Sequence, residues 1–285
     1  MFFHRMTLMQ RLANSWKLIK GSFQLIVEHP KLFIFPVLGI LSFVGFLIVL
    51  ILLLSPLLLI GAATEANIGG LFFVAILMLL FFGPFFGTFF AVGLSHEVGQ
   101  VLSGKNVSIR RGIKHAFHNL GEVILWSLTL FLVNLIAAAL RSQARKLGVA
   151  GRIVGDTLVD VLMAGWGFVT AFVIPIMVFE DTNPFHSIKR SVSLLKHTWG
   201  ETLVGYIGAG SLLGLLVIPL FLLLFIPIIG LFFLPVFILG VVFVALLTQV
   251  FNTVFMTALY IYATKKDTKH AEKYFEKDLI LHGFY

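Results

Sequence analysis

Histidine and glutamate recur at helical spacing in two places along this chain. His115, His118 and Glu122 are separated by three and four residues, and His197 and Glu201 repeat the second interval. Side chains at these spacings share one face of an α-helix, and His and Glu are ordinary zinc ligands, so two such faces could hold a metal. The same residues lie opposite an apolar stripe on the helix. This favours the simpler interpretation, a polar face exposed to water.

A second polar cluster lies between two apolar runs, at residues 141–160. Its basic members are Arg141, Arg145, Lys146 and Arg152, and Asp156 and Asp160 follow them. Arg donates bidentate hydrogen bonds to phosphate and carboxylate groups, so this cluster could bind an anion or a lipid headgroup. Arg152 and Asp156 are also four residues apart, as are Asp156 and Asp160. Ion pairing within one helix is therefore the simpler explanation.

Polar side chains are few inside the long apolar runs. The middles of these runs lack Asp, Glu, Lys, Arg and His, which argues against a proton- or ion-coupled pump. Asn134, Gln249 and Asn252 are among the polar residues that remain there. We expect them to form hydrogen bonds between helices, and the alternative is that they line a path for a solute.

The rest of the sequence contains no recognisable catalytic motif. The chain has no cysteine, so it has no thiol nucleophile, thiolate metal site or disulfide. It also has no phosphate-binding glycine loop, HExxH zinc motif or nucleophile elbow. We therefore predict no catalytic, cofactor-binding or metal-binding residues, and we expect that the protein is not an enzyme.

The composition places the chain in a membrane. Of its 285 residues, 59% are hydrophobic and only 12% are charged, with a mean hydropathy of +1.02. Soluble domains carry about a quarter charged residues. The formal charge of +8 then indicates membrane topology and attraction to anionic lipid headgroups rather than a nucleic-acid partner.

Six apolar runs have the length of about twenty residues that a membrane-crossing helix needs. They are Leu32–Leu59, Leu71–Leu94, Gly121–Leu140, Leu158–Phe179, Leu203–Ile226 and Leu231–Tyr262. Four prolines are expected to kink these spans: Pro84, Pro175, Pro219 and Pro235. We predict an all-α membrane protein with six transmembrane helices.

A half-polar segment precedes each pair of spans. Apolar residues recur there with helical spacing of four, three and four, at Leu12, Trp16, Ile19 and Phe23, at Ile109, Ile113, Ala116 and Leu120, and at Ile188, Val192, Leu195 and Trp199. Three basic residues surround each stripe. The chain is therefore interpreted as one transmembrane domain, 1–285, of three parallel repeats at about 7–100, 106–181 and 184–264. Each repeat is an amphipathic helix followed by a membrane hairpin, and residues 265–285 form a charged tail.

The basic residues also predict the orientation. With the N-terminus inside, every Lys and Arg lies on the inner side except the 141–152 cluster. Both termini are then cytoplasmic, and the N-terminal segment is interpreted as retained. The amphipathic helices are expected either to lie on the inner surface against anionic lipid or to pack on the bundle, and these two interpretations carry equal weight. His96-Glu97 and Glu180-Asp181 end spans two and four at this surface, where they could pair with the basic helices.

Three stretches carry a resemblance to a known family. They are "SWKLIKGSF…FIFPVL" near the start, "VIPIMVFEDTNPFHSIKRSVSLLKHTWGE" at 173–201 and "FNTVFMTALYIYAT" at 251–264. In this order they resemble an uncharacterised prokaryotic family of six-span integral membrane proteins, a domain of unknown function. The helix-plus-hairpin unit has a looser likeness to the membrane domain of some glycerophosphodiester phosphodiesterases. The resemblance implies a multi-pass protein of the cytoplasmic membrane of a prokaryote and no catalytic residues.

Three classes of function follow from these observations. The favoured one is a non-enzymatic lipid-handling or membrane-scaffold component, whose partners are anionic lipids, other membrane proteins or a second copy of the chain. The second is a transporter or channel for a neutral or anionic solute, with Asn134, Gln249 and Asn252 along its path. The third is a membrane enzyme acting on lipid headgroups. A continuous polar cavity between spans three and six would favour transport.

Overall fold

The computed structural model describes residues 8–63, 69–196, 215, 217–223, 229–264 and 273–275, and every regular element within them is helical. The first half contains α1 (Leu8–Glu28), the 3-10 helix η1 (Pro30–Phe33), α2 (Ile34–Ala63), α3 (Gly69–Leu102) and α4 (Ile109–His118). The second half contains α5 (Leu120–Arg145), α6 (Gly148–Val169), α7 (Val173–Glu180), a helical stretch at 184–196, α9 (Val217–Leu223) and α10 (Ile229–Ala263). The all-α prediction is confirmed.

Five helical segments in the described ranges are long and apolar enough to cross a membrane. They are Pro30–Ile60, Gly69–Leu102, Leu120–Arg145, Gly148–Glu180 and Leu234–Ala263. These segments contain predicted spans one to four and most of span six. The predicted fifth span, Leu203–Ile226, lies mostly outside the described residues. The protein is a multi-pass membrane protein.

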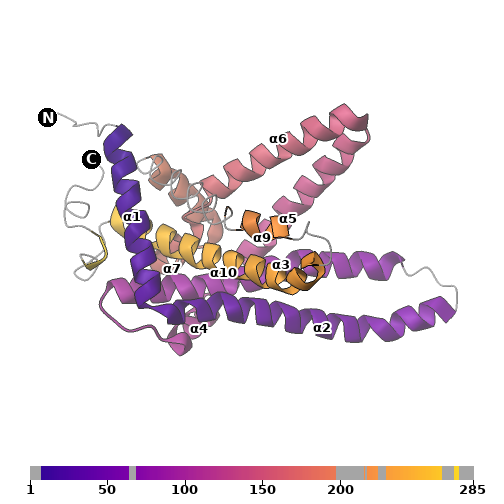
Figure 1. Cartoon of the computed structure of the whole chain (residues 1–285), viewed down its shortest axis with the longest axis horizontal. Coiled ribbons are helices and arrows are strands. Elements are labelled where there is room, and N and C mark those ends of the chain that lie inside the picture. Colours follow the sequence, from indigo (N-terminus) through magenta and orange to yellow (C-terminus); the bar gives the residue numbers. More distant parts are fainter. Residues whose placement is uncertain are drawn as a thin grey trace.

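The long helices form two hairpins, and a fifth long helix packs beside them. Figure 1 shows α2 and α3 running side by side, α5 and α6 forming a second hairpin at an angle to the first, and α10 lying along α3. Helix α1 runs across one end of this arrangement and packs against α10. Helices α4 and α7 lie toward that same end. We call it the charged end, because α1, α4 and the 184–196 helix bring Lys and Arg residues there.

The turn between α5 and α6 depends on glycine. Gly148 has a φ of +81°, a left-handed conformation that only glycine adopts at little cost. Gly151 and Gly155 then face α5 one helical turn apart, where added Cβ atoms would meet Leu147 and Ala144. The absence of side chains lets the two helices approach closely, as small residues do at membrane helix contacts.

Predicted span four is longer than expected and is broken. Its helix begins at Gly148, and it is interrupted between Val169 and Val173 before α7 continues it. Pro175 explains the break, because its ring would clash with the carbonyl of Ala171 and it has no N–H to bond there. Tighter bonds replace the regular ones, such as Val173 N–H to the Thr170 carbonyl at 3.0 Å. The predicted disturbance at Pro175 is thus confirmed.

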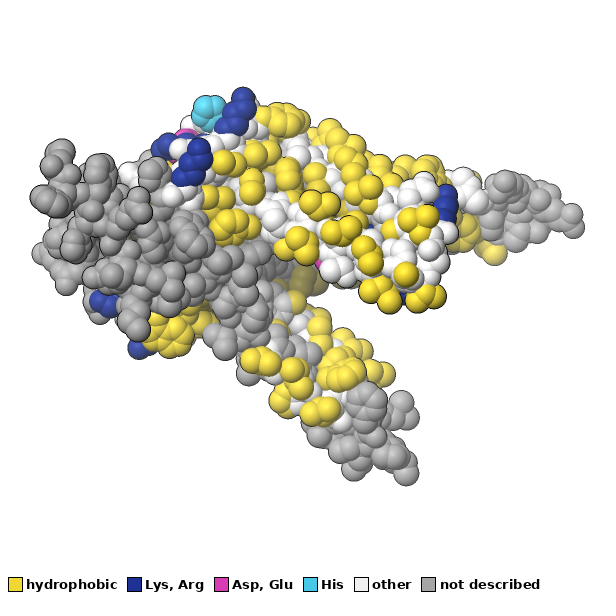
Figure 2. Space-filling model, turned by 90° about the horizontal axis from the view of Figure 1, so that it is seen from above, with side chains coloured by type: hydrophobic (Ala, Val, Ile, Leu, Met, Phe, Trp, Pro, Cys, Tyr) yellow, Lys and Arg dark blue, Asp and Glu magenta, His cyan; other side chains and the backbone are white. Residues whose placement is uncertain are grey.

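The core is concentrated toward the charged end. Leu18 and Leu25 of α1 pack there with Val92 of α3 and with Phe251 and Tyr260 of α10. Elsewhere the helices present large apolar side chains outward, and Figure 2 shows hydrophobic side chains over both projecting arms of the molecule and the notch between them. A soluble protein would not expose such surface, whereas lipid chains cover it at no cost.

The amphipathic helices bury part of the predicted apolar stripe and leave part of it exposed. Ile19, Ala116 and Leu195 are buried as expected, but Trp16 is 51% exposed and Val192 is also exposed. Leu18 and Leu194 are buried in their place. The exposed Trp16 and Val192 fit the interpretation in which the stripe lies against lipid, whereas the buried residues fit packing on the bundle.

Candidate functional site

A pocket of about 620 Å³ lies where α3, α5, α7 and α10 approach one another. Its described lining is Pro84, Gly87, Thr88 and Ala91 of α3, Trp126 and Leu130 of α5, Ile174 of α7, and Ala245, Thr248, Gln249, Asn252 and Thr253 of α10. Pro84 and Gly87 lack bulky side chains at one wall, and this leaves the space open. The pocket is bordered by membrane-crossing helices, so it is an intramembrane site.

The polar groups of the pocket come mainly from one face of α10. Gln249 and Asn252 lie three residues apart, so both point to the same side of the helix. The hydroxyls of Thr248 and Thr253 donate to the carbonyls of Val244 and Gln249, at 2.8 and 2.9 Å. Asn252 Oδ1 is buried and has no hydrogen-bond partner. The face therefore offers oxygen acceptors to whatever enters the pocket.

The structure brings together two of the three predicted polar residues. Asn134 is exposed on α5, away from the pocket, and its Nδ2 donates to the Leu130 carbonyl at 2.8 Å. Among the described residues, Asn134 is thus hydrogen-bonded within its own helix, with no bond to another helix, and it does not line the pocket. Thr88 and Trp126, which the sequence did not single out, do line the pocket, because the fold places α3 against α5 and α10.

The basic cluster at 141–152 lies at the tip of the α5–α6 hairpin. Arg152 pairs with Asp156 at 3.8 Å, which confirms the predicted ion pair within the helix. Arg141 pairs with Asp160 at 2.6 Å across the hairpin, a partner that the sequence did not indicate. Arg145 and Lys146 are exposed at the tip. Two of the four basic side chains already have a carboxylate, so the pairing interpretation accounts for half of the cluster.

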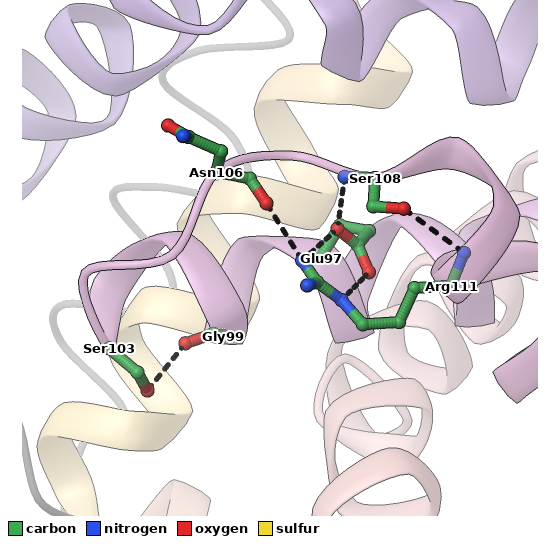
Figure 3. A network of polar contacts seen from close by, with 6 residues as sticks. All are labelled: Glu97, Gly99, Ser103, Asn106, Ser108 and Arg111. Atoms are coloured by element: carbon green, nitrogen blue, oxygen red, sulfur yellow. Dashed lines mark hydrogen bonds and ion pairs between the residues drawn. The ribbon is translucent and has the colours of Figure 1, made fainter.

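Glu97 of α3 is fully buried at the charged end and organises the start of α4. Its carboxylate accepts hydrogen bonds from Arg111 Nε at 2.8 Å, from Arg111 Nη2 at 2.6 Å and from the Ser108 backbone N–H at 2.7 Å (Figure 3). Ser108 caps α4, its hydroxyl accepting from Arg111 N–H at 3.4 Å, and Arg111 also reaches the Asn106 carbonyl at 2.8 Å. The contact raises the pKa of the Arg111 guanidinium, chiefly through its hydrogen bond to Glu97.

A second carboxylate at this end pairs in the same way. Glu180, at the end of α7, accepts from Arg190 Nε at 3.2 Å and from the hydroxyl of Tyr260 at 3.0 Å. The predicted pairing of the interfacial carboxylates with the basic helices is therefore confirmed at both Glu97 and Glu180. These two contacts tie each short helix to the membrane helix before it.

His115 is half-buried and not fully solvated as predicted, whereas His118 on the same face is exposed to water as predicted. Its ring stacks on His96 with centroids 3.9 Å apart, and Asn119 Nδ2 lies 3.1 Å from its Nε2. Burial, followed by the positive charge of His118, lowers the pKa of His115, while Asp181 and Glu97 act in the opposite direction. The close contact between α3 and α4 covers this ring.

Metal binding finds no support at these histidines. Among the residues that the structure describes, no three His, Asp or Glu side chains come together as a metal-binding group. Glu122 is partly buried on α5, and His197 and Glu201 lie outside the described residues.

The segment 273–275 packs against the end of α1 at the charged end. Lys273 Nζ lies 2.6 Å from Glu28, and the Tyr274 hydroxyl lies 3.1 Å from the same carboxylate and 3.0 Å from His29 Nε2. The hydrogen bond from Lys273, followed by those from Gln24 and Tyr274, lowers the pKa of Glu28 to about 2. Phe275 is buried over Gly21, where an added Cβ would lie 2.6 Å from its ring. No sequence pattern indicated this contact.

Comparison with known proteins identifies the family. Residues 71–270 match a family of unknown function, DUF6159, and the chain belongs to it. No curated protein and no solved structure matches the chain. The predicted likeness to an uncharacterised family is thus confirmed at this level, and the likeness to the phosphodiesterase membrane domain receives no support.

Proposed function

We propose that this member of a family of unknown function is a non-enzymatic, lipid-binding protein with six membrane spans in three helix-plus-hairpin repeats. The α1–η1–α2–α3 and α4–α5–α6–α7 segments support the first two repeats, since each starts with a short helix at the charged end. The helix at 184–196 and α10 are consistent with the third. The charged end faces the cytoplasm, in accordance with the distribution of Lys and Arg.

The observation that carries this proposal is the pairing of basic and aromatic side chains on the outside of the charged end. Helix α4 exposes Arg110 and Lys114, and its Phe117 is 59% exposed. On α1, Lys20 Nζ lies 5.6 Å from the ring centre of the exposed Trp16. Aromatic rings settle at the headgroup level of a bilayer and cations attract anionic lipid there, so this surface has the chemistry of a lipid-binding interface.

Native mass spectrometry of the protein extracted with its own lipids tests the proposal. The double variant Arg110→Gln, Lys114→Gln should lose bound anionic lipid, because each cation near the surface contributes about 1 kcal/mol. The comparison variant, Arg145→Gln with Lys146→Gln, removes two exposed cations from the opposite tip, where the sequence also allows an anion site, and retained lipid in this variant would place binding at the charged end. Equal retention by the parent and both double variants would contradict lipid binding at the charged end.

A second candidate function is transport of a neutral solute. Gln249 and Asn252 support it, because both line the intramembrane pocket. The lining is mostly apolar, however, and Asn134 lies outside it, so the described pocket has the character of a side-opening site more than of a polar channel. Proteoliposomes that conduct glycerol faster than protein-free liposomes would favour transport over lipid binding.

A further inference from the structure

We infer that the pocket between α3, α5 and α10 binds one neutral, hydroxyl-bearing amphiphile, with the hydroxyl at Asn252 and the chain against the apolar part of the lining. This inference names a ligand class for the lipid-binding function proposed above and rests on it. The site differs from the charged end in location and in chemistry, because it lies within the membrane-crossing helices.

The dimensions and walls of the pocket suit an amphiphile. Its volume of about 620 Å³ is within the range of ~300–1,000 Å³ that holds ligands of drug size. Trp126, Leu130 and Ile174 supply large, mainly apolar side chains to the lining from α5 and α7. Thr88 precedes Glu97 on α3 by about 13 Å of helix rise, so the polar face lies well below the charged surface. A ligand at that depth arrives from the bilayer.

The ligand is neutral, because the described lining contains no ionisable side chain. An anionic headgroup moved to this depth would lose its hydration without gaining a counter-charge. The cations of the protein are elsewhere, at the charged end and at the α5–α6 tip. Anionic lipids therefore belong at the surface, and an uncharged headgroup belongs in the pocket.

The ligand carries a hydrogen-bond donor. Asn252 Oδ1 is buried without a partner, and leaving a buried acceptor unpaired is unfavourable. The protons of Thr248 and Thr253 are already committed to backbone carbonyls, so their hydroxyls present lone pairs to the pocket. The amides of Gln249 and Asn252 add N–H donors to these acceptors, and a hydroxyl is the neutral group of an amphiphile that both donates and accepts.

Photocrosslinking with matched probes tests the inference. The purified full chain in nanodiscs would be titrated with a monoacylglycerol that carries a diazirine on its chain, and with the same chain on a glycerol phosphate. We expect the neutral probe to label peptides of α3, α5 or α10 and to be displaced by unlabelled monoacylglycerol. Equal labelling of these peptides by the phosphate probe would overturn the neutral ligand class.

Two pairs of variants localise the site. Asn252→Leu should lower the apparent affinity for the neutral probe by about tenfold, the effect of one lost hydrogen bond. Asn134→Leu on α5 should leave that affinity unchanged. Gly87→Phe should abolish labelling, because Gly87 lines the pocket and an added Cβ there meets no atom within 4 Å. Gly45→Phe on α2, equally unobstructed but outside the pocket, is its control.

The outcomes separate this inference from the proposed function. If the chain retains its own lipids but labelling is insensitive to Asn252→Leu and Gly87→Phe, the pocket assignment is wrong and lipid binding stands. If free glycerol displaces the probe at the concentration that monoacylglycerol requires, the apolar chain contributes nothing and the amphiphile class is wrong. Loss of labelling in both pocket variants, with both controls intact, supports the inference.

Discussion

Replacing Arg111 alone should destabilise the protein more than replacing both Arg111 and its buried partner Glu97. Arg111→Met leaves the Glu97 carboxylate fully buried with one remaining donor, the Ser108 N–H. Glu97→Gln removes the carboxylate partner of Arg111, but the Arg111 side chain keeps its bond to the Asn106 carbonyl, is 35% exposed and can reach water. The double variant buries no charge. The three variants therefore separate the effect of an unpaired charge from the effect of a lost contact.

The magnitudes follow from the burial of each group. Breaking a buried ion pair from one side costs about 3–5 kcal/mol, and the retained Ser108 bond places Arg111→Met near about 3 kcal/mol. Glu97→Gln should cost about 1–2 kcal/mol, the contribution of a charge-assisted hydrogen bond. The double variant should also cost about 1–2 kcal/mol and should be more stable than Arg111→Met. At Glu180, which is 21% exposed and keeps its Tyr260 bond, Arg190→Met should cost less than about 1 kcal/mol.

Thermal unfolding in detergent, followed by size-exclusion chromatography after heating, would rank these variants. The expected order of melting temperature is parent, then Arg190→Met, then Glu97→Gln and the double variant, and Arg111→Met last. If the double variant melts below Arg111→Met, or if Arg190→Met melts as low as Arg111→Met, the burial of an unpaired carboxylate is not the cause of the loss.

Three further predictions concern the charged end. Because burial lowers the pKa of His115, its unfolded form takes up a proton first as pH falls below 6.5, so the melting temperature should decrease from pH 8 to pH 5 and His115→Gln should flatten that decrease. Gly112→Val should cost about 1–3 kcal/mol or more, because an added Cβ lies 2.9 Å from a backbone oxygen of α3, whereas Gly121→Val meets no atom within 4 Å beyond its own helix; comparison of the two melting temperatures checks this. Phe275→Ala should release the segment at 273–275, since it removes a buried aromatic side chain, and the release would appear as faster proteolysis of the C-terminal tail without loss of the membrane core; an unchanged rate would contradict the contact with α1.

Local pattern was enough where a single helix decides the outcome. The apolar runs predicted the membrane helices because a bilayer demands about twenty apolar residues whatever the neighbours are. The Arg152–Asp156 pair was predictable because both residues lie on one helix, four residues apart. The pairing of Glu97 and Glu180 with basic helices could be anticipated because each carboxylate lies near the end of one helix and its partner lies on the next helix, a short distance along the chain.

Local pattern failed where a second helix decides the outcome. His115 looked solvated because its own helix places it opposite the apolar stripe, yet His96 of α3 covers it. The sequence left open whether the stripe of α1 faces lipid or the bundle, and the structure exposes Trp16 while burying Leu18. Asn134 looked equivalent to Asn252 in an apolar run, but only Asn252 faces the point where three helices approach one another. Such outcomes depend on helix rotation and crossing, which no single segment encodes.

By itself the sequence determined that the chain crosses a membrane repeatedly, where its basic segments lie and that it has no thiol, since these properties depend on composition and on distances along the chain. The tertiary structure alone decided that Gln249, Asn252 and Thr88 share one pocket, that Glu97 is buried and that the segment around Phe275 closes on α1. The physical reason is that hydrophobic partitioning acts on each helix separately. Pockets and buried ion pairs arise only when helices distant in sequence pack together.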